Sequence, residues 1–206
     1  MKEKKEIKTV IFDIGNVLMT FNFMPYIKRL LGNDQVIENV IGALWGTGYW
    51  DQLDLGMDAE EVFSRMIQAR PEYEEEIRKT LANVRDCMGR KDYAIDWIRE
   101  LKERGYQVLY LSNYSEFIMD ARREVLDFLP YMDGGIFSCN VKVIKPDPEI
   151  FRLLCDKYGL DPGECVFIDD NKDNIKAAKA FGLNAIHFTG YEEAREELEQ
   201  MLGNNK

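Results

Sequence analysis

Residues 9–18, TVIFDIGNVL, decide the fold of this chain. Residues 10–12 are β-branched or aromatic, which is typical of a strand that is buried on both faces of a parallel sheet. Asp13 ends this apolar run, and Gly15 and Asn16 are residue types that bend a chain sharply. Asp13 is therefore predicted at the carboxyl end of a central strand, where open α/β sheets bind their ligands. Taken alone, Asp13 is better interpreted as a residue that caps a turn, and the rest of the chain decides between the two interpretations.

Further buried strands follow in the second half of the chain, and helices separate them. Short apolar runs that predict strands occupy residues 108–111, 134–138, 165–168 and 185–188. Helical spacing and capping residues predict helices over residues 90–104, 117–126, 174–181 and 191–202, and one that begins after Asp147 at Pro148. Because strands alternate with helices, the predicted fold class is α/β with a parallel sheet.

The connection from Asp13 to the second strand is about three times as long as an ordinary βαβ unit. Its apolar residues recur at helical spacing, and no strand pattern occurs between residues 26 and 104. Asp58 and Glu61 form a capping box that starts one of these helices, whereas residues 19–25 are predicted to form a loop with exposed aromatic side chains. We therefore predict a small helical domain at residues 22–85, inserted into a core formed by residues 1–21 and 86–206.

Length and composition limit the classes of function. The chain has 206 residues, of which 46% are hydrophobic and 12% aromatic, enough for one core domain with a smaller insert. Its formal net charge of −10 argues against nonspecific nucleic-acid binding, and an anionic substrate must be held by local positive groups. The four cysteines are scattered, which predicts reduced thiols and no zinc site. No leader-like or membrane-spanning apolar run occurs, so a cytoplasmic protein without membrane association is expected.

Polar side chains end three of the predicted strands, and a lysine opens a helix. These residues are Asp13, the pair Ser112-Asn113, the pair Asp169-Asp170, and Lys145. In a parallel sheet the three strand ends lie at the same edge. Acidic groups that converge there repel each other unless a divalent cation binds between them, and their oxygen atoms suit Mg²⁺. A hydroxyl, an amide and an ammonium group nearby suit a phosphate, so phosphoryl transfer to Asp13 through an aspartyl-phosphate intermediate is predicted.

Four segments, in this order, resemble the motifs of the haloacid dehalogenase-like (HAD) hydrolase superfamily. They are FDIGNVL at 12–18, LSN at 111–113, KPDPEIF at 145–151 and FIDDNKDN at 167–174. The helical insert is similar to the C1-type cap of that family. The resemblance implies a Rossmann-like core with an all-helical cap, Mg²⁺ as cofactor, and phosphatase chemistry on a small phosphorylated metabolite.

The resemblance also implies a role for each matching residue. Asp13 matches the nucleophile and a metal ligand, Asp170 the second carboxylate at the metal, and Gly15 the position whose backbone carbonyl binds the metal. Ser112 matches the hydroxyl that hydrogen-bonds the transferring phosphoryl group, and Lys145 the cation that balances the charge of nucleophile and phosphate. The supporting positions are Asn113 beside the substrate, and Asp169 and Asn174 around the metal.

Gly15 departs from the pattern of the family. Most phosphatases of the superfamily have a second Asp at this position, which protonates the leaving group and later activates water. The loss of this acid costs least when the leaving hydroxyl is itself acidic, as the anomeric hydroxyl of a sugar is. A GNVL-type first motif also resembles bacterial sugar-phosphate phosphatases, including glucose-1-phosphate phosphatases. Sugar phosphates are therefore the predicted substrates.

Two other functions remain open from the sequence. In a 2-haloacid dehalogenase Asp13 would attack carbon without a metal, and the acidic pair at 169–170 argues against this alternative. A catalytically impaired protein that binds a phosphometabolite or a partner would have lost turnover together with the acid at Gly15.

Single residues of the insert give weaker signals. Trp50 is predicted to contact the substrate, although packing in the core of the insert explains an aromatic residue there equally well. Asp51 and Asp54 are predicted to be solvated carboxylates in a loop rather than catalytic acids, although Asp51 stays open as a residue of the insert that helps to protonate the leaving group. His187, the only histidine, is predicted to have a structural role.

Overall fold

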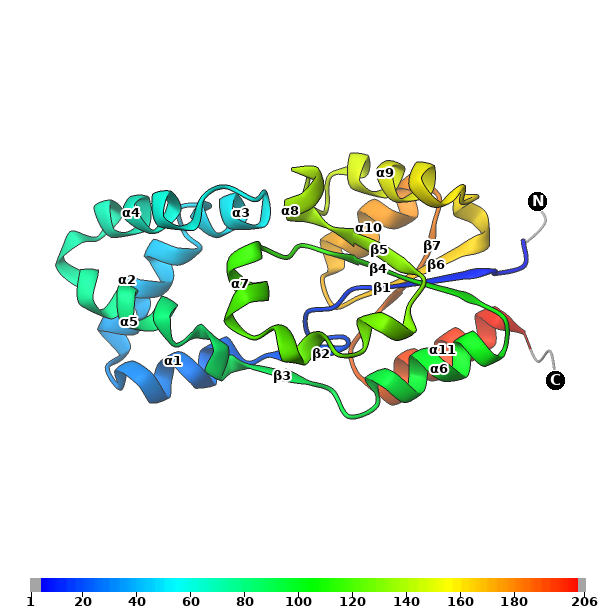
Figure 1. The fold of residues 1–206 in the computed structure, drawn as a ribbon, viewed down its shortest axis with the longest axis horizontal. Coiled ribbons are helices and arrows are strands. Elements are labelled where there is room, and N and C mark those ends of the chain that lie inside the picture. The colour runs from blue at the N-terminus through cyan, green and yellow to red at the C-terminus, as the bar shows by residue number, and fades with distance from the viewer. Residues whose placement is uncertain (1–4, 204–206) are drawn as a thin grey trace.

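The computed structural model describes residues 5–203. A five-stranded parallel sheet in the order β5-β4-β1-β6-β7 forms its core (Figure 1). The strand that precedes Asp13, β1, lies at the centre of this sheet, so the predicted fold class is confirmed. The strands are β1 Thr9–Phe12, β4 Gln107–Ser112, β5 Gly134–Phe137, β6 Cys165–Asp169 and β7 Asn184–His187.

Helices cover both faces of the sheet, as the two-sided burial of β1 requires. Val10 and Phe12 belong to the apolar cluster on one face, where the ring of Phe12 meets the edge of Trp97 at 4.8 Å between centroids. Ile11 belongs to the cluster on the opposite face, because successive side chains of a strand alternate. The first face carries α6 (Ala94–Glu103) and α11 (Tyr191–Leu202), and the second carries α9 (Pro148–Tyr158) and α10 (Lys172–Phe181).

A layer of helices lies beyond the carboxyl edge of the sheet, at the left of Figure 1. Its apolar residues pack into the same cluster as the first face of the sheet, so the layer is continuous with the core. The backbone N–H of Glu61 donates a hydrogen bond to the Asp58 side chain at 2.9 Å, which confirms Asp58 as the predicted N-cap. Within residues 5–203 the other half of the predicted capping box is not formed, because the Glu61 side chain accepts a hydrogen bond from Arg65. The helices are α1 Phe23–Leu31, α2 Asp34–Leu44, α3 Tyr49–Asp54, α4 Ala59–Ala69 and α5 Glu74–Ala82.

Two short strands that the sequence did not predict join this layer to the sheet. Strands β2 (Met19–Phe21) and β3 (Met88–Arg90) pair in antiparallel register, with Thr20 opposite Gly89. The prediction of a loop over residues 19–25, and of no strand between residues 26 and 104, is therefore wrong. A three-residue strand is too short to show an alternating pattern, and its partner is 69 positions away along the chain.

Two predicted helices have different bounds in the structure. The helix expected over 90–104 begins only at Ala94, because β3 takes up residues 88–90. The helix expected over 117–126 divides into α7 (Glu116–Ala121) and a 3-10 turn (Arg123–Leu126). At the break, Arg122 leaves the helical conformation, with φ −155° and ψ 67°. Its side chain donates hydrogen bonds to the carbonyl of Arg85 and to that of Met88, the first residue of β3.

Helix α10 begins two residues before its predicted start at Asn174. The side chain of Asn171 accepts a hydrogen bond from the Asp173 N–H and caps the helix. The remaining elements are the short helix α8 (Ser138–Val141) and the 3-10 turns Pro71–Tyr73, Val84–Cys87, Leu129–Tyr131 and Pro162–Glu164. Within residues 5–203 no helix is long and apolar enough to cross a bilayer.

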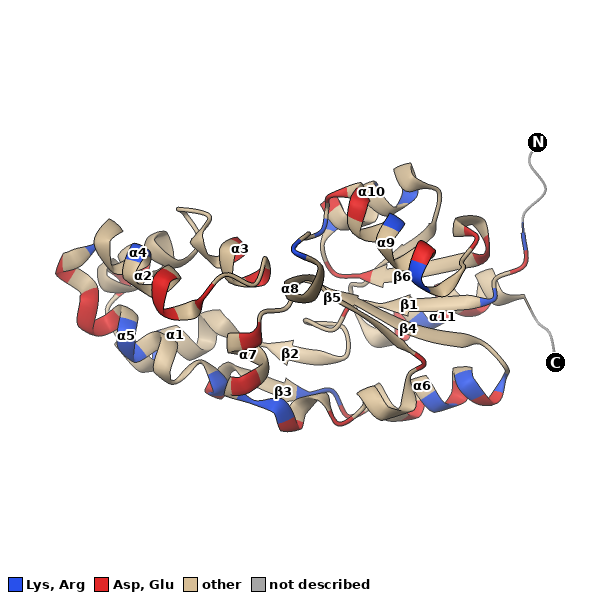
Figure 2. Ribbon diagram, turned by 45° about the horizontal axis from the view of Figure 1, so that its top comes forward, with Lys and Arg blue, Asp and Glu red and all other residues tan. Residues whose placement is uncertain are grey.

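Charged residues lie mainly on the outer helices, such as α5 and α6 (Figure 2). The five strands of the sheet contain one charged residue, Asp169, at the end of β6. Asp169 is fully buried. A buried carboxylate needs a partner of opposite charge or several hydrogen bonds, and the residues that supply them lie at the carboxyl edge of the sheet.

Candidate active site

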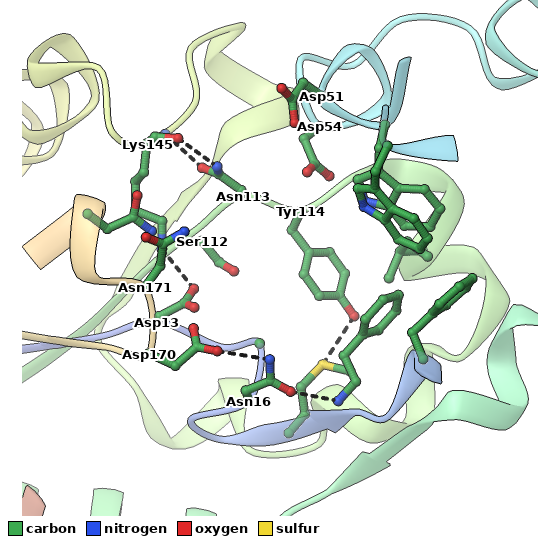
Figure 3. A pocket seen from close by; sticks show the side chains of 18 of the residues that line it. Asp13, Asn16, Asp51, Asp54, Ser112, Asn113, Tyr114, Lys145, Asp170 and Asn171 are labelled. Carbon is green, nitrogen blue, oxygen red and sulfur yellow. Dashed lines mark hydrogen bonds and ion pairs between the residues drawn. The ribbon is translucent and has the colours of Figure 1, made fainter. Parts of the chain in front are cut away.

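The carboxyl ends of β1, β4 and β6 meet at a cavity that opens toward the helical layer (Figure 3). The structure places nearly all of the residues that the sequence singled out around this cavity. The predicted site residues that line it are Asp13, Gly15, Trp50, Ser112, Asn113, Lys145, Asp170 and Asn174. Asp169 lies behind them and has no exposed surface.

Lys145 joins two carboxylates at the bottom of the cavity. Its Nζ lies 2.9 Å from Oδ1 of Asp13 and 2.7 Å from Oδ2 of Asp169, and it donates a third hydrogen bond, of 2.9 Å, to the backbone carbonyl of Leu111. All three donors of the ammonium group are therefore used. The side chain of Lys145 is 1% exposed, so water does not weaken these contacts.

Burial and charge act in opposite directions on this group of residues. Burial raises the pKa of Asp13 to about 7, although the nearby ammonium group of Lys145 lowers it, and repulsion from Asp169 adds to the rise. For Lys145 burial favours the neutral amine, but attraction by Asp13 and Asp169 outweighs it, and its pKa lies above the ordinary value. The lysine therefore stays charged and stabilises the ionised form of Asp13.

Asn113 holds the backbone of Lys145 in place. The Asn113 side-chain carbonyl accepts a hydrogen bond of 2.8 Å from the Lys145 N–H, and its amide group donates one of 2.9 Å to the Lys145 carbonyl. This pair of hydrogen bonds links the loop after β4 to the loop before α9, which brings the lysine of one segment to the aspartates of two others.

The carboxylate of Asp169 is fully used by hydrogen bonds within the protein. Its Oδ1 accepts from the Asn171 N–H at 2.7 Å, and its Oδ2 accepts from Asn174 at 3.0 Å and from Lys145 at 2.7 Å. These contacts explain how a fully buried carboxylate is tolerated. They also leave Asp169 with little capacity to bind a ligand.

Asp170 points into the cavity and is oriented by a residue that the sequence analysis did not assign to the site. Asn16 Nδ2 donates a hydrogen bond of 2.9 Å to Asp170 Oδ2, and Asn16 Oδ1 accepts one of 3.1 Å from the Phe21 N–H. Asn16 has a φ of 57°, in the left-handed region that asparagine tolerates. Burial and repulsion by Asp169 raise the pKa of Asp170, and the hydrogen bond from Asn16 opposes this rise.

His187 contacts the backbone of the site rather than its cavity. Its Nε2 lies 3.0 Å from the carbonyl oxygen of Asp170, and because a carbonyl can only accept, the ring nitrogen donates. The histidine fixes the chain just after β6, which agrees with the structural role predicted for it.

The acidic residues of the site fit a hard divalent cation. Carboxylate oxygens of Asp13, Asp169 and Asp170 lie within 4.8 Å of one another. Asp169 is occupied by internal hydrogen bonds, so Asp13 and Asp170 are the carboxylates that remain for an ion, and Gly15 lines the same cavity. Oxygen ligands alone, without histidine or cysteine, suit Mg²⁺.

Aromatic residues form the wall of the cavity opposite the carboxylates. The rings of Trp45 and Trp50 stack at 4.7 Å between centroids, and Phe23 meets Trp45 edge-on at 4.4 Å. Trp50 is only 8% exposed, so it packs in the insert and borders the cavity at the same time. Packing in the core of the insert therefore describes its position, and contact with a substrate stays a prediction.

Asp54 differs from the prediction of a solvated loop carboxylate. It is the last residue of helix α3, it lines the cavity, and it is 8% exposed. The prediction is wrong because the segment after Gly48 folds into a helix whose end is covered by α8 and by the loop after β4. Asp51, one turn earlier, is exposed to solvent, as predicted, but it lies on helix α3 and also borders the cavity.

Comparison with known protein families finds a match over most of the chain. The family model described as haloacid dehalogenase-like hydrolase matches residues 7–182. The sesquiterpene phosphatase astK of Aspergillus oryzae is 26% identical over 197 residues, which cover 95% of this chain and 97% of that protein. The (S)-2-haloacid dehalogenase 4A of Burkholderia cepacia is 30% identical over 93 residues, which cover 45% of this chain and 40% of that protein.

Solved structures share the fold of the chain. The HAD family enzyme BT-2542 of Bacteroides thetaiotaomicron superimposes with a TM-score of 0.73 at 23% identity, over 94% of this chain and 99% of that one. The same enzyme in complex with magnesium and inorganic phosphate gives a TM-score of 0.69 at 22% identity, over 87% and 93% of the two chains. At this level of identity the likeness concerns the fold.

Proposed function

Because the chain belongs to the haloacid dehalogenase-like hydrolase family, we propose that it is a Mg²⁺-dependent phosphatase that forms an aspartyl phosphate on Asp13. One observation carries this proposal: a buried lysine, Lys145, lies between Asp13 and Asp169. Beside them is a further carboxylate, Asp170, which has no basic partner within residues 5–203. The lysine balances the nucleophile, and the second carboxylate adds the negative charge that a metal ion needs.

The proposed roles follow from the contacts of each residue. Asp13 attacks phosphorus, Ser112 donates a hydrogen bond to a phosphoryl oxygen, and Lys145 balances the charge of both. Mg²⁺, held by Asp13, Asp170 and the carbonyl of Gly15, would neutralise negative charge on the phosphoryl oxygens when it is bound. The supporting residues are Asp169 and Asn174 around the metal site, and Asn113 and Trp50 beside the substrate.

We propose small phosphorylated metabolites, and sugar phosphates among them, as substrates. The aromatic wall that includes Trp45 and Trp50 supports this class, because aromatic rings stack on the apolar face of a sugar. The helices at residues 22–85 are proposed to be a C1-type cap that selects the group attached to the phosphate. Since one relative is a sesquiterpene phosphatase by name, apolar phosphate esters belong in the same substrate panel.

The test is phosphate release from sugar phosphates, isoprenoid phosphates and an aryl phosphate, with Mg²⁺ and with a chelator. We expect turnover only with Mg²⁺, and none from Asp13→Asn, because an amide is neither a nucleophile nor a good ligand for Mg²⁺. Turnover by Asp13→Asn at the wild-type rate would remove Asp13 from the mechanism. Metal-independent halide release from a 2-haloacid would instead support a dehalogenase, and binding without turnover would support a phosphometabolite-binding protein.

We further propose that the protein acts in the cytoplasm. The four cysteines are buried and form no disulfide, which supports a reducing compartment. The proposed partner is the small-molecule substrate alone, since the net charge of −10 disfavours nucleic acid.

A further inference from the structure

We propose that Asp54, on the helical insert, is the acid that protonates the leaving group in place of the Asp that Gly15 lacks. The inference rests on the proposed phosphatase function. It extends that function because Asp54 lies outside the four segments that resemble the family motifs. The residue is assigned from its position in the cavity, its burial and the way the fold holds it.

The carboxyl group of Asp54 points into the cavity from the side of the insert (Figure 3). Asp13 is on the opposite side, at the end of β1. A phosphate attacked by Asp13 must expel its leaving oxygen away from Asp13, and therefore toward the insert. Asp54 is more than nine-tenths buried. Within residues 5–203 no hydrogen bond or ion pair reaches its carboxyl group, which borders the cavity. A buried carboxyl group without a partner is costly unless it is neutral or meets a ligand.

The backbone of Asp54 is fixed to the core by a chain of hydrogen bonds. The Tyr114 N–H, in the loop after β4, donates to Ser138 Oγ at 3.0 Å, and Ser138 Oγ donates to the Asp54 carbonyl at 2.6 Å. Gly56, two residues after Asp54, is held in the same way, because the Lys142 side chain donates a hydrogen bond of 2.8 Å to its carbonyl. The core thereby holds the end of α3 over the cavity, and Asp54 is positioned as a catalytic group must be.

A side chain at Gly56 would prevent this contact between insert and core. A Cβ atom there would lie 2.7 Å from the backbone oxygen of Cys139, and Gly56 has a φ of 73°. Only glycine allows α3 to approach α8 so closely. The close approach fixes the end of α3, which carries Asp54, against the core.

The surroundings of Asp54 bring its pKa into the neutral range, so that its protonated and ionised forms are both populated near neutral pH. Burial raises its pKa to about 7, repulsion by Asp51 on the same helix adds to the rise, and Asp13 across the cavity acts in the same direction. Lys145 opposes the shift. The other ionisable groups that interact with it are those of Tyr114 and Cys139, both of which burial keeps neutral. A carboxyl group in this state can donate a proton and take it back within one cycle.

The reaction balances with Asp54 as the single proton carrier. Asp13 attacks phosphorus, the bond from phosphorus to the leaving oxygen breaks, and that oxygen takes the electron pair and the proton of Asp54. The products are an alcohol, an aspartyl phosphate and the Asp54 carboxylate. Water then attacks phosphorus and gives a proton to Asp54, the bond from phosphorus to Asp13 breaks, and its electron pair returns to the Asp13 carboxylate. Inorganic phosphate leaves, and both aspartates are restored.

The test compares the wild type with Asp54→Asn and with the matched variant Asp51→Asn, whose carboxylate is one turn away and exposed. Phosphoenzyme formation is measured in single turnovers with Mg²⁺, from 2,4-dinitrophenyl phosphate and from an alkyl phosphate. The alkyl leaving group needs a proton and the dinitrophenolate does not. In Asp54→Asn the ratio of the two rate constants should rise by about 10²–10⁴-fold, the usual contribution of general acid catalysis. In Asp51→Asn the ratio should stay far closer to that of the wild type, because this variant removes only the repulsion through which Asp51 raises the pKa of Asp54.

A second variant keeps the test independent of any damage to the fold. A Cβ at Gly15 would meet only Asp13 Oδ2, at an ordinary 3.9 Å, and Gly15 is not in the left-handed region. The double variant Gly15→Asp with Asp54→Asn should therefore have an acid on the core in place of the one on the insert. Its ratio of the rate constants for the dinitrophenyl and alkyl esters should be lower than that of Asp54→Asn alone. An unchanged ratio in a folded Asp54→Asn protein, or a rise in Asp51→Asn instead, would overturn the role of Asp54. If the wild type takes phosphate from neither ester, the phosphatase proposal itself is wrong and the assignment of Asp54 ends with it.

Discussion

As the proposed nucleophile, Asp13 must satisfy two requirements that conflict inside a protein. A nucleophile has to be ionised, whereas burial favours its neutral form and raises its pKa to about 7. Lys145 reconciles the two requirements, because its ammonium group lies 2.9 Å from the nucleophile and is itself held by Asp169. Such a group is sensitive to the loss of any one partner.

We expect Lys145→Met to lower the free energy of unfolding by about 3–5 kcal/mol, because it leaves two buried carboxylates without a countercharge. Urea unfolding at neutral pH measures this loss. Lys176→Met is the matched control, since Lys176 is exposed and pairs with Asp173 at the surface. An equal, small effect of both substitutions would mean that the buried carboxylates do not depend on the lysine.

We expect Asn16→Ala to weaken Mg²⁺ binding by about 10–100-fold, the usual cost of losing a residue that orients a metal ligand. Asn16→Gly is the control for backbone strain, because glycine accepts the positive φ of this position but cannot hydrogen-bond Asp170. Isothermal titration with Mg²⁺ measures both variants. If Asn16→Gly binds the metal as the wild type does, the contact with Asp170 has no role in binding.

Individual residues of the site could be predicted from sequence when their chemistry is local. Asp13 and Ser112 directly follow buried strands, so their place at the edge of the sheet could be read from one short segment each. Asn16, Asp54 and Ser138 could not be assigned in this way, because each acts through contacts with residues far away in the chain. A carboxylate in the sequence of an insert gives no sign of whether it is solvated or buried.

Among the elements, helix α3 has both a structural and a proposed functional side. It presents Trp50 to the aromatic wall and Asp54 to the cavity, and its end contacts the core through Ser138. The strands β2 and β3 have a structural role alone, and each of them forms only because it pairs with the other. Their three residues each carry no periodic signal, and only the folded chain brings them together.

We expect Trp50→Phe to change the order of preference among sugar and isoprenoid phosphates while a small aryl phosphate is still turned over. Phenylalanine keeps an aromatic ring against Trp45 but opens space in the wall of the cavity. Specificity constants for the panel measure the change, and thermal unfolding reports any loss of packing. An equal loss on every substrate would make Trp50 a residue of the core of the insert only.

For the whole molecule, the concentration of acidic groups at one edge of the sheet links stability to metal binding. We expect saturating Mg²⁺ to raise the melting temperature, since 100 times Kd contributes about 2.7 kcal/mol, and each kcal/mol corresponds to about 2–4 °C in a chain of this size. Asp170→Asn should abolish the shift and, by removing repulsion, melt no lower than the metal-free wild type. A thermal shift assay with Mg²⁺ and with chelator decides this, and an unchanged wild type at saturating metal would count against a preformed site.

The strands of the sheet could be predicted from the sequence because each of the central ones is buried on both faces and therefore reads as a continuous apolar run. Residues 10–12 and 165–168 are continuous apolar runs for this reason, and both became neighbouring strands of the sheet. The order of strands and the placement of the insert above the sheet depend on contacts between distant residues. These features had to come from the three-dimensional arrangement.

The pairing of β2 with β3 brings together the two points at which the chain enters and leaves the helical layer. The chain leaves the core at Phe21 and returns to it at Met88, and the register places these two residues opposite each other. A two-residue turn is sufficient to join such an antiparallel pair, so the core does not need the insert to remain connected. The helical layer can therefore change in length between these two points without a change in the register of β1, the strand that precedes Asp13.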